Sequence, residues 1–367
     1  MTAILDFEAQ LQLQDDTFQV LNILDKEGKV LDSDLEGQVG LSDEQLVALI
    51  KDMLFSRTLN DRSTKLAKQG RLGFFAPTIG QEASQIASQL AFAPEDYLLP
   101  GYRDIPQLIL HGLTIEQAFL WSRGHYDALD VPEELHVWFP QIVIGAQIIE
   151  TAGIALGLKK KKTGTVAFTY TGDGGSSQGD TYEGINFAGA YHAPAVFFIQ
   201  NNGFAISTPR GVQTAAPHLA AKGWAAGIPS IVVDGMDPLA MYLAAKTARE
   251  WAASGKGPVL IETLTSRFGP HSMSGDDPLR YRTQADLDDW LPHDPLIRFR
   301  NYLEAKGLWS KEQEQATIDE LNAKIDTAVE NADNVAKMKV STMLKHTLEV
   351  PGQAMQEQID YFEGQGK

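Results

Sequence analysis

The stretch TYTGDGGSSQGDTYEGINFAGA, Thr169 to Ala190, begins in a short apolar run and ends in a helix-like pattern. Between the two parts lies Asp173, flanked by Gly172, Gly174 and Gly175. Glycines at the end of a buried strand let the backbone approach a ligand and present its N–H groups to it. A buried aspartate there needs a partner, and a hard cation would supply one. A plain strand–turn–helix connection, with Asp173 as a helix cap, is the alternative.

Strand-like and helix-like runs alternate around this stretch. Such alternation predicts βαβ units and an α/β fold, in which helices flank a buried, mostly parallel β-sheet. The predicted strands are 165–170, 194–200, 230–235 and 257–265, and the clearest predicted helices are 145–160, 179–193 and 238–254.

The two ends of the chain differ from this middle part. Residues 18–31 predict two short strands around a turn at 25–28, and Ser42 with Gln45 predicts a capping box that begins a helix. Ser310 with Gln313 predicts another before a long amphipathic run. We therefore expect an N-terminal extension at 1–40, an α/β domain at 41–290 and a helical C-terminal segment at 291–367, which packs on partner subunits.

Composition excludes several classes of function. The chain has 367 residues and a formal net charge of −17, which argues against a nucleic-acid partner. It contains no cysteine, so disulfides, thiolate catalysis and cysteine-ligated zinc are excluded. No apolar run approaches the roughly 20 residues needed to span a membrane, and the N-terminus lacks the pattern of a signal peptide. We expect a cytoplasmic protein.

A second strand end strengthens the cation interpretation. Asn201 and Asn202 follow the strand after Asp173, and Asn202 comes 29 residues after that aspartate. If the two strands lie close together, both side chains emerge at one edge of the sheet. Carboxylate and amide oxygens suit Mg²⁺ that also binds phosphate oxygens. Neither a Walker P-loop nor the dinucleotide fingerprint is present.

GDG followed after about thirty residues by NN resembles the thiamine diphosphate motif. Around it, GRLGFFAPTIGQEA (70–83), LLPGYRD (98–104), QIVIGAQ (141–147) and RFGPHSMSGDDPLRYRT (267–283) occur in the same order as in relatives. Together they resemble the α subunits of the E1 component of 2-oxo acid dehydrogenase complexes, and most closely the pyruvate branch of Gram-positive bacteria. The resemblance extends from about residue 40 to residue 310.

The resemblance implies a set of cofactor-binding residues. It implies that Mg²⁺ is held by Asp173, Asn202 and the backbone carbonyl of Phe204. Amides of Gly174 and Gly175, together with Tyr102 and Arg103, would contact the diphosphate, for which the planar charged fork of arginine is suited. Ile142 and Ile144 would flank the aminopyrimidine.

The aperiodic stretch 266–283 is predicted to be an active-site loop. The resemblance places His271 above the thiazolium, with a role in reductive acylation of the lipoyl group. Polar contacts would order the loop, and Ser272 and Ser274 match a region that is phosphorylated in mitochondrial relatives, although we expect them to be plain loop residues. The predicted ordering residues are Arg267, Asp276, Tyr281 and Arg282.

Two further assignments come from the resemblance. His125 is a candidate second active-site histidine, with His136 as a weaker competitor. Asp180 and Glu183 lie three residues apart, on one face of the helix after the glycine-rich turn. They would belong to an acidic passage that links two active sites, or would simply favour the start of the helix.

The implied activity is oxidative decarboxylation of pyruvate, a small 2-oxo acid, with acetyl transfer to the lipoyl group of the E2 dihydrolipoyl acyltransferase. A separate E1 β subunit would complete an α2β2 heterotetramer and supply the glutamate that thiamine diphosphate needs. The branched-chain 2-oxo acid enzyme and acetoin-cleaving relatives share these motifs. A transketolase-like transferase and a non-catalytic binding subunit are alternatives of other classes.

Overall fold

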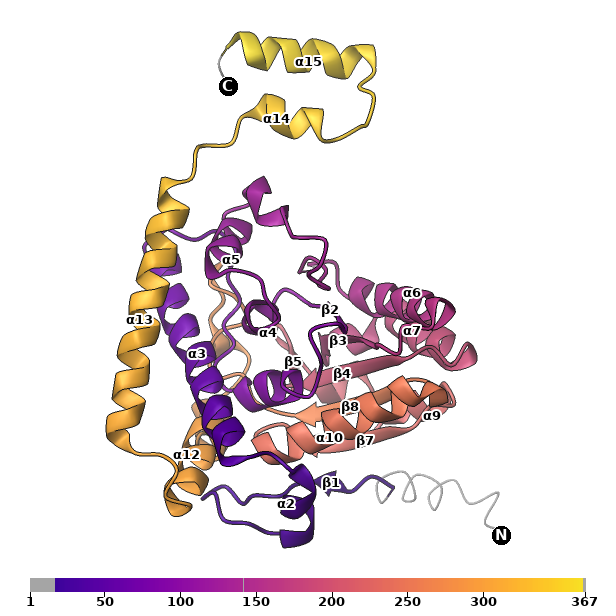
Figure 1. Ribbon diagram of the computed structural model, residues 1–367, viewed down its shortest axis with the longest axis vertical. Coiled ribbons are helices and arrows are strands. Elements are labelled where there is room, and N and C mark those ends of the chain that lie inside the picture. Colours follow the sequence, from indigo (N-terminus) through magenta and orange to yellow (C-terminus); the bar gives the residue numbers. More distant parts are fainter. Residues whose placement is uncertain (1–16, 141, 366–367) are drawn as a thin grey trace.

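A six-stranded parallel β-sheet forms the centre of the chain, with strand order β1-β7-β8-β4-β3-β2 (Figure 1). The computed structural model describes residues 17–140 and 142–365. Every pairing in the sheet is parallel, which confirms the predicted α/β fold. Among the described residues no helix is long and apolar enough to cross a membrane. The strands are β1 (Val20–Leu21), β2 (Tyr97–Leu99), β3 (Ala167–Gly172), β4 (Ala195–Asn201), β7 (Ser230–Asp234) and β8 (Val259–Leu264).

Helices cover both faces of the sheet, because the central strands are apolar on both sides. On β3 and β4, Phe168 and Phe198 pack into one core, while Phe197 and Ile199 pack into the other. The first core is covered by α3 (Asp43–Lys68), the π-helix η2 (Ala83–Ala87), α10 (Pro238–Trp251) and α12 (Pro295–Ala305). The second is covered by α6 (Ala146–Lys161) and α7 (Gly179–Ala190), and α9 (Ala221–Ala225) packs nearby.

Helices α6 and α7 pack closely because small residues line their contact. A Cβ at Gly184 of α7 would lie 2.9 Å from the Cα of Ile149 in α6, so a larger side chain would push the helices apart. This packing fixes the start of α7 at the carboxyl edge of the sheet, directly after the glycine-rich turn.

The N-terminal segment joins the sheet instead of forming a separate hairpin. Leu24 and Val30 form an isolated antiparallel bridge around the predicted turn, but β1 pairs with β7. Asp237 Oδ2 accepts hydrogen bonds from the backbone N–H groups of Ile23 and Leu24 at 2.6 and 2.7 Å. The predicted pair of strands around the turn is therefore reduced to one bridge, and its first strand belongs to the main sheet.

The capping boxes predicted from sequence differ in outcome. Both reciprocal hydrogen bonds form at Ser42 and Gln45, where α3 begins. At the start of α13 (Lys311–Asn334), Ser310 Oγ accepts from Gln313 N, which is one of the two bonds of the predicted box.

The C-terminal segment is helical, as predicted. Helix α13 packs along α3 and α5 (Ile115–Ser122), and α14 (Val340–Lys345) and α15 (Gln353–Gly364) form a hairpin that stands apart from the main body (Figure 1). That this segment packs on partner subunits stays a prediction, as do the three domain boundaries. The remaining short elements are α2 (Ser33–Val39), α4 (Ile105–Leu110), η3 (Tyr126–Leu129), η4 (Gly175–Ser177), β5 (Phe204–Ala205), β6 (Thr208–Pro209), α8 (Arg210–Gln213), η5 (Ala252–Lys256), η6 (Pro278–Arg280), α11 (Gln284–Asp288) and η7 (Leu291–His293).

Candidate functional site

A cavity of about 420 Å³ lies where β3 and β4 end, at the carboxyl edge of the sheet. Its walls come from the turn after β2, the start of α6, the ends of β3 and β4, the β5–β6 hairpin and the loop after β8. This is the position at which parallel α/β sheets bind ligands. Ten residues predicted from sequence line this one cavity: Tyr102, Arg103, Ile142, Ile144, Asp173, Gly174, Gly175, Asn202, Phe204 and His271.

The aspartate at the end of β3 is buried, with 1% of its surface exposed. Burial raises the pKa of the Asp173 carboxyl above its usual value, because the charged form loses its hydration. Gln213 Nε2 in α8 donates to Asp173 Oδ2 at 2.7 Å. A carboxylate held in this way at the floor of a cavity gains from a nearby cation.

The two glycines after this aspartate line the cavity with backbone alone, and neighbouring atoms leave no room for a side chain at either position. A Cβ at Gly174 would lie 2.5 Å from the Cβ of Ala205, and one at Gly175 would overlap with Thr171 Oγ1. Backbone therefore lies directly against the cavity here, which is what close approach to a diphosphate requires.

The side chains of the two asparagines at the end of β4 point in different directions and have different hydrogen-bond partners. Asn201 turns inward, and its Nδ2 donates to Glu262 Oε1 at 2.7 Å, while its Oδ1 accepts from Gly203 N at 3.2 Å. Gly203 has a φ of +83°, which permits the turn that follows. Asn202 faces the cavity, and its Oδ1 accepts from Phe204 N at 3.4 Å.

The donor set at this end of the cavity fits a hard cation bound together with a diphosphate. A carboxylate oxygen of Asp173, an amide oxygen of Asn202 and the carbonyl oxygen of Phe204 are all oxygen donors. Only one of the three is charged, so phosphate oxygens would complete the set, as is usual for Mg²⁺.

Arginine and tyrosine from the turn after β2 form the opposite wall. Arg103 Nη2 donates to the carbonyl oxygen of His271 at 2.9 Å and lies 3.3 Å from its Nδ1, and Nη1 donates to Pro77 O. The ring of Tyr102 meets the His271 ring edge-on, with centroids 5.9 Å apart. The turn and the loop after β8 are thus in direct contact.

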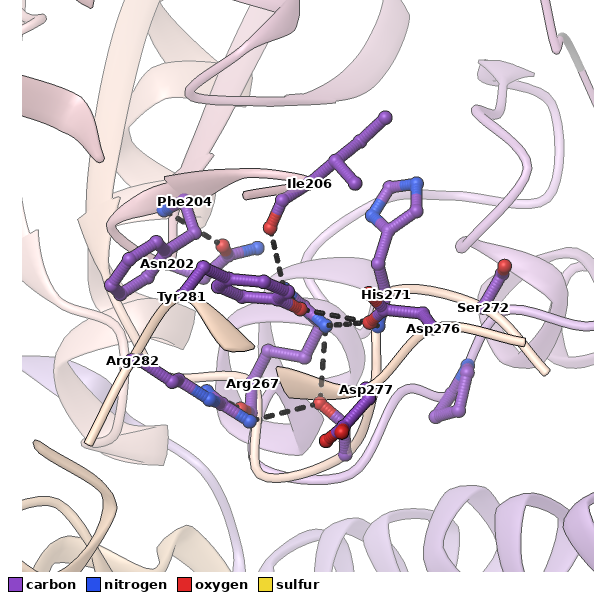
Figure 2. A network of polar contacts seen from close by, with 12 residues as sticks. Asn202, Phe204, Ile206, Arg267, His271, Ser272, Asp276, Asp277, Tyr281 and Arg282 are labelled. Atoms are coloured by element: carbon purple, nitrogen blue, oxygen red, sulfur yellow. Dashed lines mark hydrogen bonds and ion pairs between the residues drawn. The ribbon is translucent and has the colours of Figure 1, made fainter. Parts of the chain in front are cut away.

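The loop that carries His271 is held by a network of polar side chains (Figure 2). Asp276 Oδ2 accepts from His271 N and from Tyr281 Oη, the latter at 2.8 Å. Arg267 Nη2 donates to Tyr281 Oη at 3.3 Å, and Arg282 Nη1 donates to Arg267 O at 2.6 Å. These are the four residues predicted to order the loop.

The same surroundings make His271 a weak base. Burial, with the charges of Arg103 and Arg267, lowers its pKa to about 4. His271 is therefore neutral at pH 7. Its Nδ1 faces a donor on Arg103, so the favoured tautomer carries its proton on Nε2.

Several predicted residues do not line the cavity. His125 Nδ1 accepts from Asp127 N at the start of η3, and its Nε2 contacts Ala336 O at 3.0 Å. His136 lies against Tyr97, with ring centroids 4.9 Å apart. Eight others lie outside the lining, six on the loop and two on α7: Arg267, Ser272, Ser274, Asp276, Tyr281, Arg282, Asp180 and Glu183.

Sequence reasoning missed a polar floor beneath the cavity. Of its members, Gln81, Asp104 and Gln147 lie within segments that carried the resemblance, but nothing in their spacing marked them as lining residues. Phe74 also lines the cavity, whereas Phe75 lines a separate small one. The missed polar lining residues are Gln81, Asp104, Gln147, Thr171 and Gln200.

One rim of the cavity is apolar and open. Ile142 and Ile144, in the segment just before α6, are 54% and 42% exposed. Isolated apolar side chains are common on surfaces, but here Val143 between them is exposed as well.

Comparison with known proteins gives close matches over nearly the whole chain. The family described as Dehydrogenase E1 component matches residues 50–341. Proteins named pyruvate dehydrogenase E1 component subunit alpha from Staphylococcus epidermidis strain RP62A and Staphylococcus aureus strain MRSA252 are 54% and 55% identical. Each alignment spans 345 residues, which is 94% of this chain and 93% of the relative.

Proposed function

Because this chain belongs to the dehydrogenase E1 component family, we propose that it is the α subunit of a pyruvate dehydrogenase E1. With a separate β subunit it carries out thiamine diphosphate-dependent oxidative decarboxylation of pyruvate. The acetyl group passes to the lipoyl group of an E2 acyltransferase. The names of the relatives favour pyruvate over the branched-chain alternative.

One observation supports this proposal above the others. Ten residues, selected from five separate segments of the sequence, line a single cavity at the carboxyl edge of the sheet. A chance likeness of short motifs would not bring such distant segments together around one space of suitable size.

In this proposal each wall of the cavity binds one part of thiamine diphosphate. Asp173, Asn202 and the carbonyl of Phe204 hold Mg²⁺, and the amides after Asp173 with Arg103 bind the diphosphate. When bound, thiamine diphosphate supplies the nucleophile and the electron sink for loss of CO₂.

His271 then acts as a neutral hydrogen-bond donor toward the reacting groups. Its low pKa keeps the ring uncharged, and its contact with Arg103 leaves the proton on Nε2. A neutral donor can stabilise developing negative charge on an oxygen without adding a full positive charge to the site.

A β subunit completes the site in this proposal. Within the described residues, the carboxylates that line the cavity are Asp104 and Asp173, and no described glutamate lies there. A β chain against the exposed rim at 142–144 would cover the apolar side chains and bring the glutamate required by the aminopyrimidine. Two such pairs would give the α2β2 assembly.

The test is 2-oxo acid-dependent dye reduction by the chain purified together with its β partner. Pyruvate, 2-oxobutyrate and 2-oxoisovalerate would be compared, with and without thiamine diphosphate and Mg²⁺. We expect turnover that needs both cofactors and favours pyruvate, and no turnover by the chain alone. A preference for 2-oxoisovalerate would contradict the assignment of pyruvate as the substrate. Activity of the lone chain would contradict the proposed requirement for a β subunit.

A matched pair of variants tests the site within the same assay. Asp173→Asn should raise the Mg²⁺ concentration needed for half-maximal activity by about 10- to 100-fold, because a charged ligand is lost. Asp288→Asn, an exposed change in α11, should behave like the wild-type protein.

A further inference from the structure

A chain of buried side-chain amides runs beneath the cavity and connects its two ends. Asn202 Nδ2 donates to Gln81 Oε1 at 3.4 Å, and Gln81 Nε2 donates to Gln200 Oε1. Gln200 Nε2 donates to Asp104 Oδ1 at 3.1 Å. Asp104 Oδ2 in turn accepts from Gly101 N at 2.8 Å, in the turn that presents Tyr102 and Arg103.

The direction of these hydrogen bonds is set by the carboxylate at their end. Asp104 accepts and cannot donate when it is ionised, so the Gln200 amide must present its nitrogen to it. The oxygen of Gln200 then faces the nitrogen of Gln81, and the oxygen of Gln81 faces the nitrogen of Asn202. This order leaves Asn202 Oδ1, and not its nitrogen, available to the cavity.

The backbone around Gln81 has little freedom. Gly80 has a φ of +94°, and a Cβ there would overlap with Ser266 O. Gly80 N donates to Glu82 Oε2 at 2.9 Å, and the Glu82 carboxylate is itself bound by Arg57 Nε. The π-helix η2 begins directly after this carboxylate, and such helices are frequent at functional sites.

A second glutamine, Gln85 on the π-helix, contacts the turn that carries Tyr102 and Arg103. Gln85 Nε2 donates to Arg103 O at 3.2 Å and lies 3.4 Å from Gln200 Oε1. Gln81, Gln85, Gln200 and Asp104 are all buried, with Gln81 only 1% exposed. Buried polar groups of this kind have no water to replace a lost partner, so each fixes the orientation of the next.

We propose that Gln81 is a positioning residue, which holds Asn202 with its amide oxygen toward the cation and ties that end of the cavity to the Tyr102–Arg103 turn. Gln81 acts through Asn202 and Gln200. The inference rests on the proposed function, because it assumes that Asn202 binds the cation. It predicts that a side chain at position 81 without an acceptor lets the Asn202 amide rotate.

The test measures binding of Mn²⁺ to the assembled enzyme in the presence of thiamine diphosphate, from the loss of the free Mn²⁺ signal in electron paramagnetic resonance. Gln81→Leu removes both amide contacts at nearly constant volume. We expect its Kd for Mn²⁺ to rise about 10- to 100-fold, as is usual when a group that orients a metal ligand is lost.

Two further variants separate positioning from packing. Gln81→Glu keeps an acceptor for Asn202 Nδ2 but cannot donate to Gln200 Oε1, so its Kd should lie between those of the wild-type protein and Gln81→Leu. Gln89→Leu removes a buried amide outside the cavity, where Gln89 bonds with His111 Nδ1 at 2.8 Å, and it should leave the Kd within about threefold of the wild-type value. If Gln81 served packing alone, the order of the Kd values for Mn²⁺ would be reversed. Gln81→Leu would then bind more tightly than Gln81→Glu, because a buried glutamate is tolerated less well than a leucine.

The outcomes distinguish the inference from the proposed function. A wild-type Kd in Gln81→Leu, or an equal loss in Gln89→Leu, would overturn the positioning role while the proposed function stands. A wild-type complex that binds neither Mn²⁺ nor thiamine diphosphate would overturn both. If Gln81→Leu does not assemble, Gln81→Asn replaces it, because the shorter amide cannot span both partners and should show the same loss.

Discussion

The two ends of the cavity are held in place by different kinds of interaction. At the end formed by β3 and β4, Asp173 and the two glycines directly follow a paired strand, and the glycines pack closely against Ala205 and Thr171. At the other end, His271 lies on a loop that is ordered by side chains such as Asp276 and Tyr281 (Figure 2). Added atoms should therefore damage the first end, whereas lost charges should damage the second.

The largest effect should come from adding a single methyl group at the strand end. Gly174→Ala places a Cβ 2.5 Å from Ala205 Cβ, so the β5 backbone must move. Overpacking of this kind costs about 1–3 kcal/mol, which corresponds to a loss of roughly 5- to 150-fold in affinity. Fluorescence titration of the assembled enzyme with thiamine diphosphate would measure this loss.

The matched control for this variant lies five residues further along the chain. A Cβ at Gly179, in the first turn of α7, meets nothing within 4 Å. Gly179→Ala should therefore bind thiamine diphosphate like the wild-type protein. Equal affinities for the two alanine variants would break the proposed difference between the two ends.

A smaller effect should follow when the loop loses its central carboxylate. Asp276→Ala removes the acceptor for His271 N and Tyr281 Oη, so the loop opens more often. Trypsin cleavage after the exposed Arg280 should become about tenfold faster, by the usual relation between opening free energy and cleavage rate. Asp288→Ala is the control, and unchanged cleavage in Asp276→Ala would show that the backbone holds the loop.

The smallest effect concerns pH. The pKa of His271 is lowered from 6.5 to about 4, so the folded protein binds fewer protons than the unfolded chain in that window. His271 therefore reduces stability as pH falls from about 6.5 toward 4 and has no such effect above it. Denaturant unfolding at pH 7 and pH 5 measures this effect. The free energy of unfolding should fall less between the two pH values for His271→Gln than for the wild-type protein.

A titration of the ring by NMR tests the cause of this shift. Arg103→Met removes one positive charge beside the ring, so the pKa of His271 should rise from about 4 while burial keeps it below 6.5. Arg62→Met, in which the lost charge pairs with Asp326 instead, should leave the titration unchanged. A midpoint near 6.5 in the wild-type protein would contradict the buried environment.

The sequence predicted the parts of the site that follow directly from strand ends. Asp173 and Asn202 could be placed together because parallel neighbouring strands end at one edge, and the structure pairs β3 with β4. The histidine loop could be recognised because its periodicity fails. The family resemblance supplied Tyr102, Arg103 and the isoleucines, which have no local signal of their own.

The amide chain beneath the cavity could not be predicted in the same way. Gln200 lies in a strand that is buried along its whole length, and its side chain meets Gln81 across 119 residues of sequence. Which amide faces which depends on strand register and on the π-helix after Gln81, and neither leaves a periodic pattern. The position of β1 was missed for a similar reason, since its partner lies in β7.

The pairing of β1 with β7 has a consequence for the order of folding. Ile23 N and Asp237 Oδ2 are separated by 214 residues, so this contact closes a very long loop. The entropic cost of closure grows only slowly with length, but contacts of such high sequence separation form late. Although it is synthesised early, the edge strand must wait until residues 230–237 have left the ribosome. Until then β1 has no partner strand, and a chaperone has its best opportunity to bind this segment.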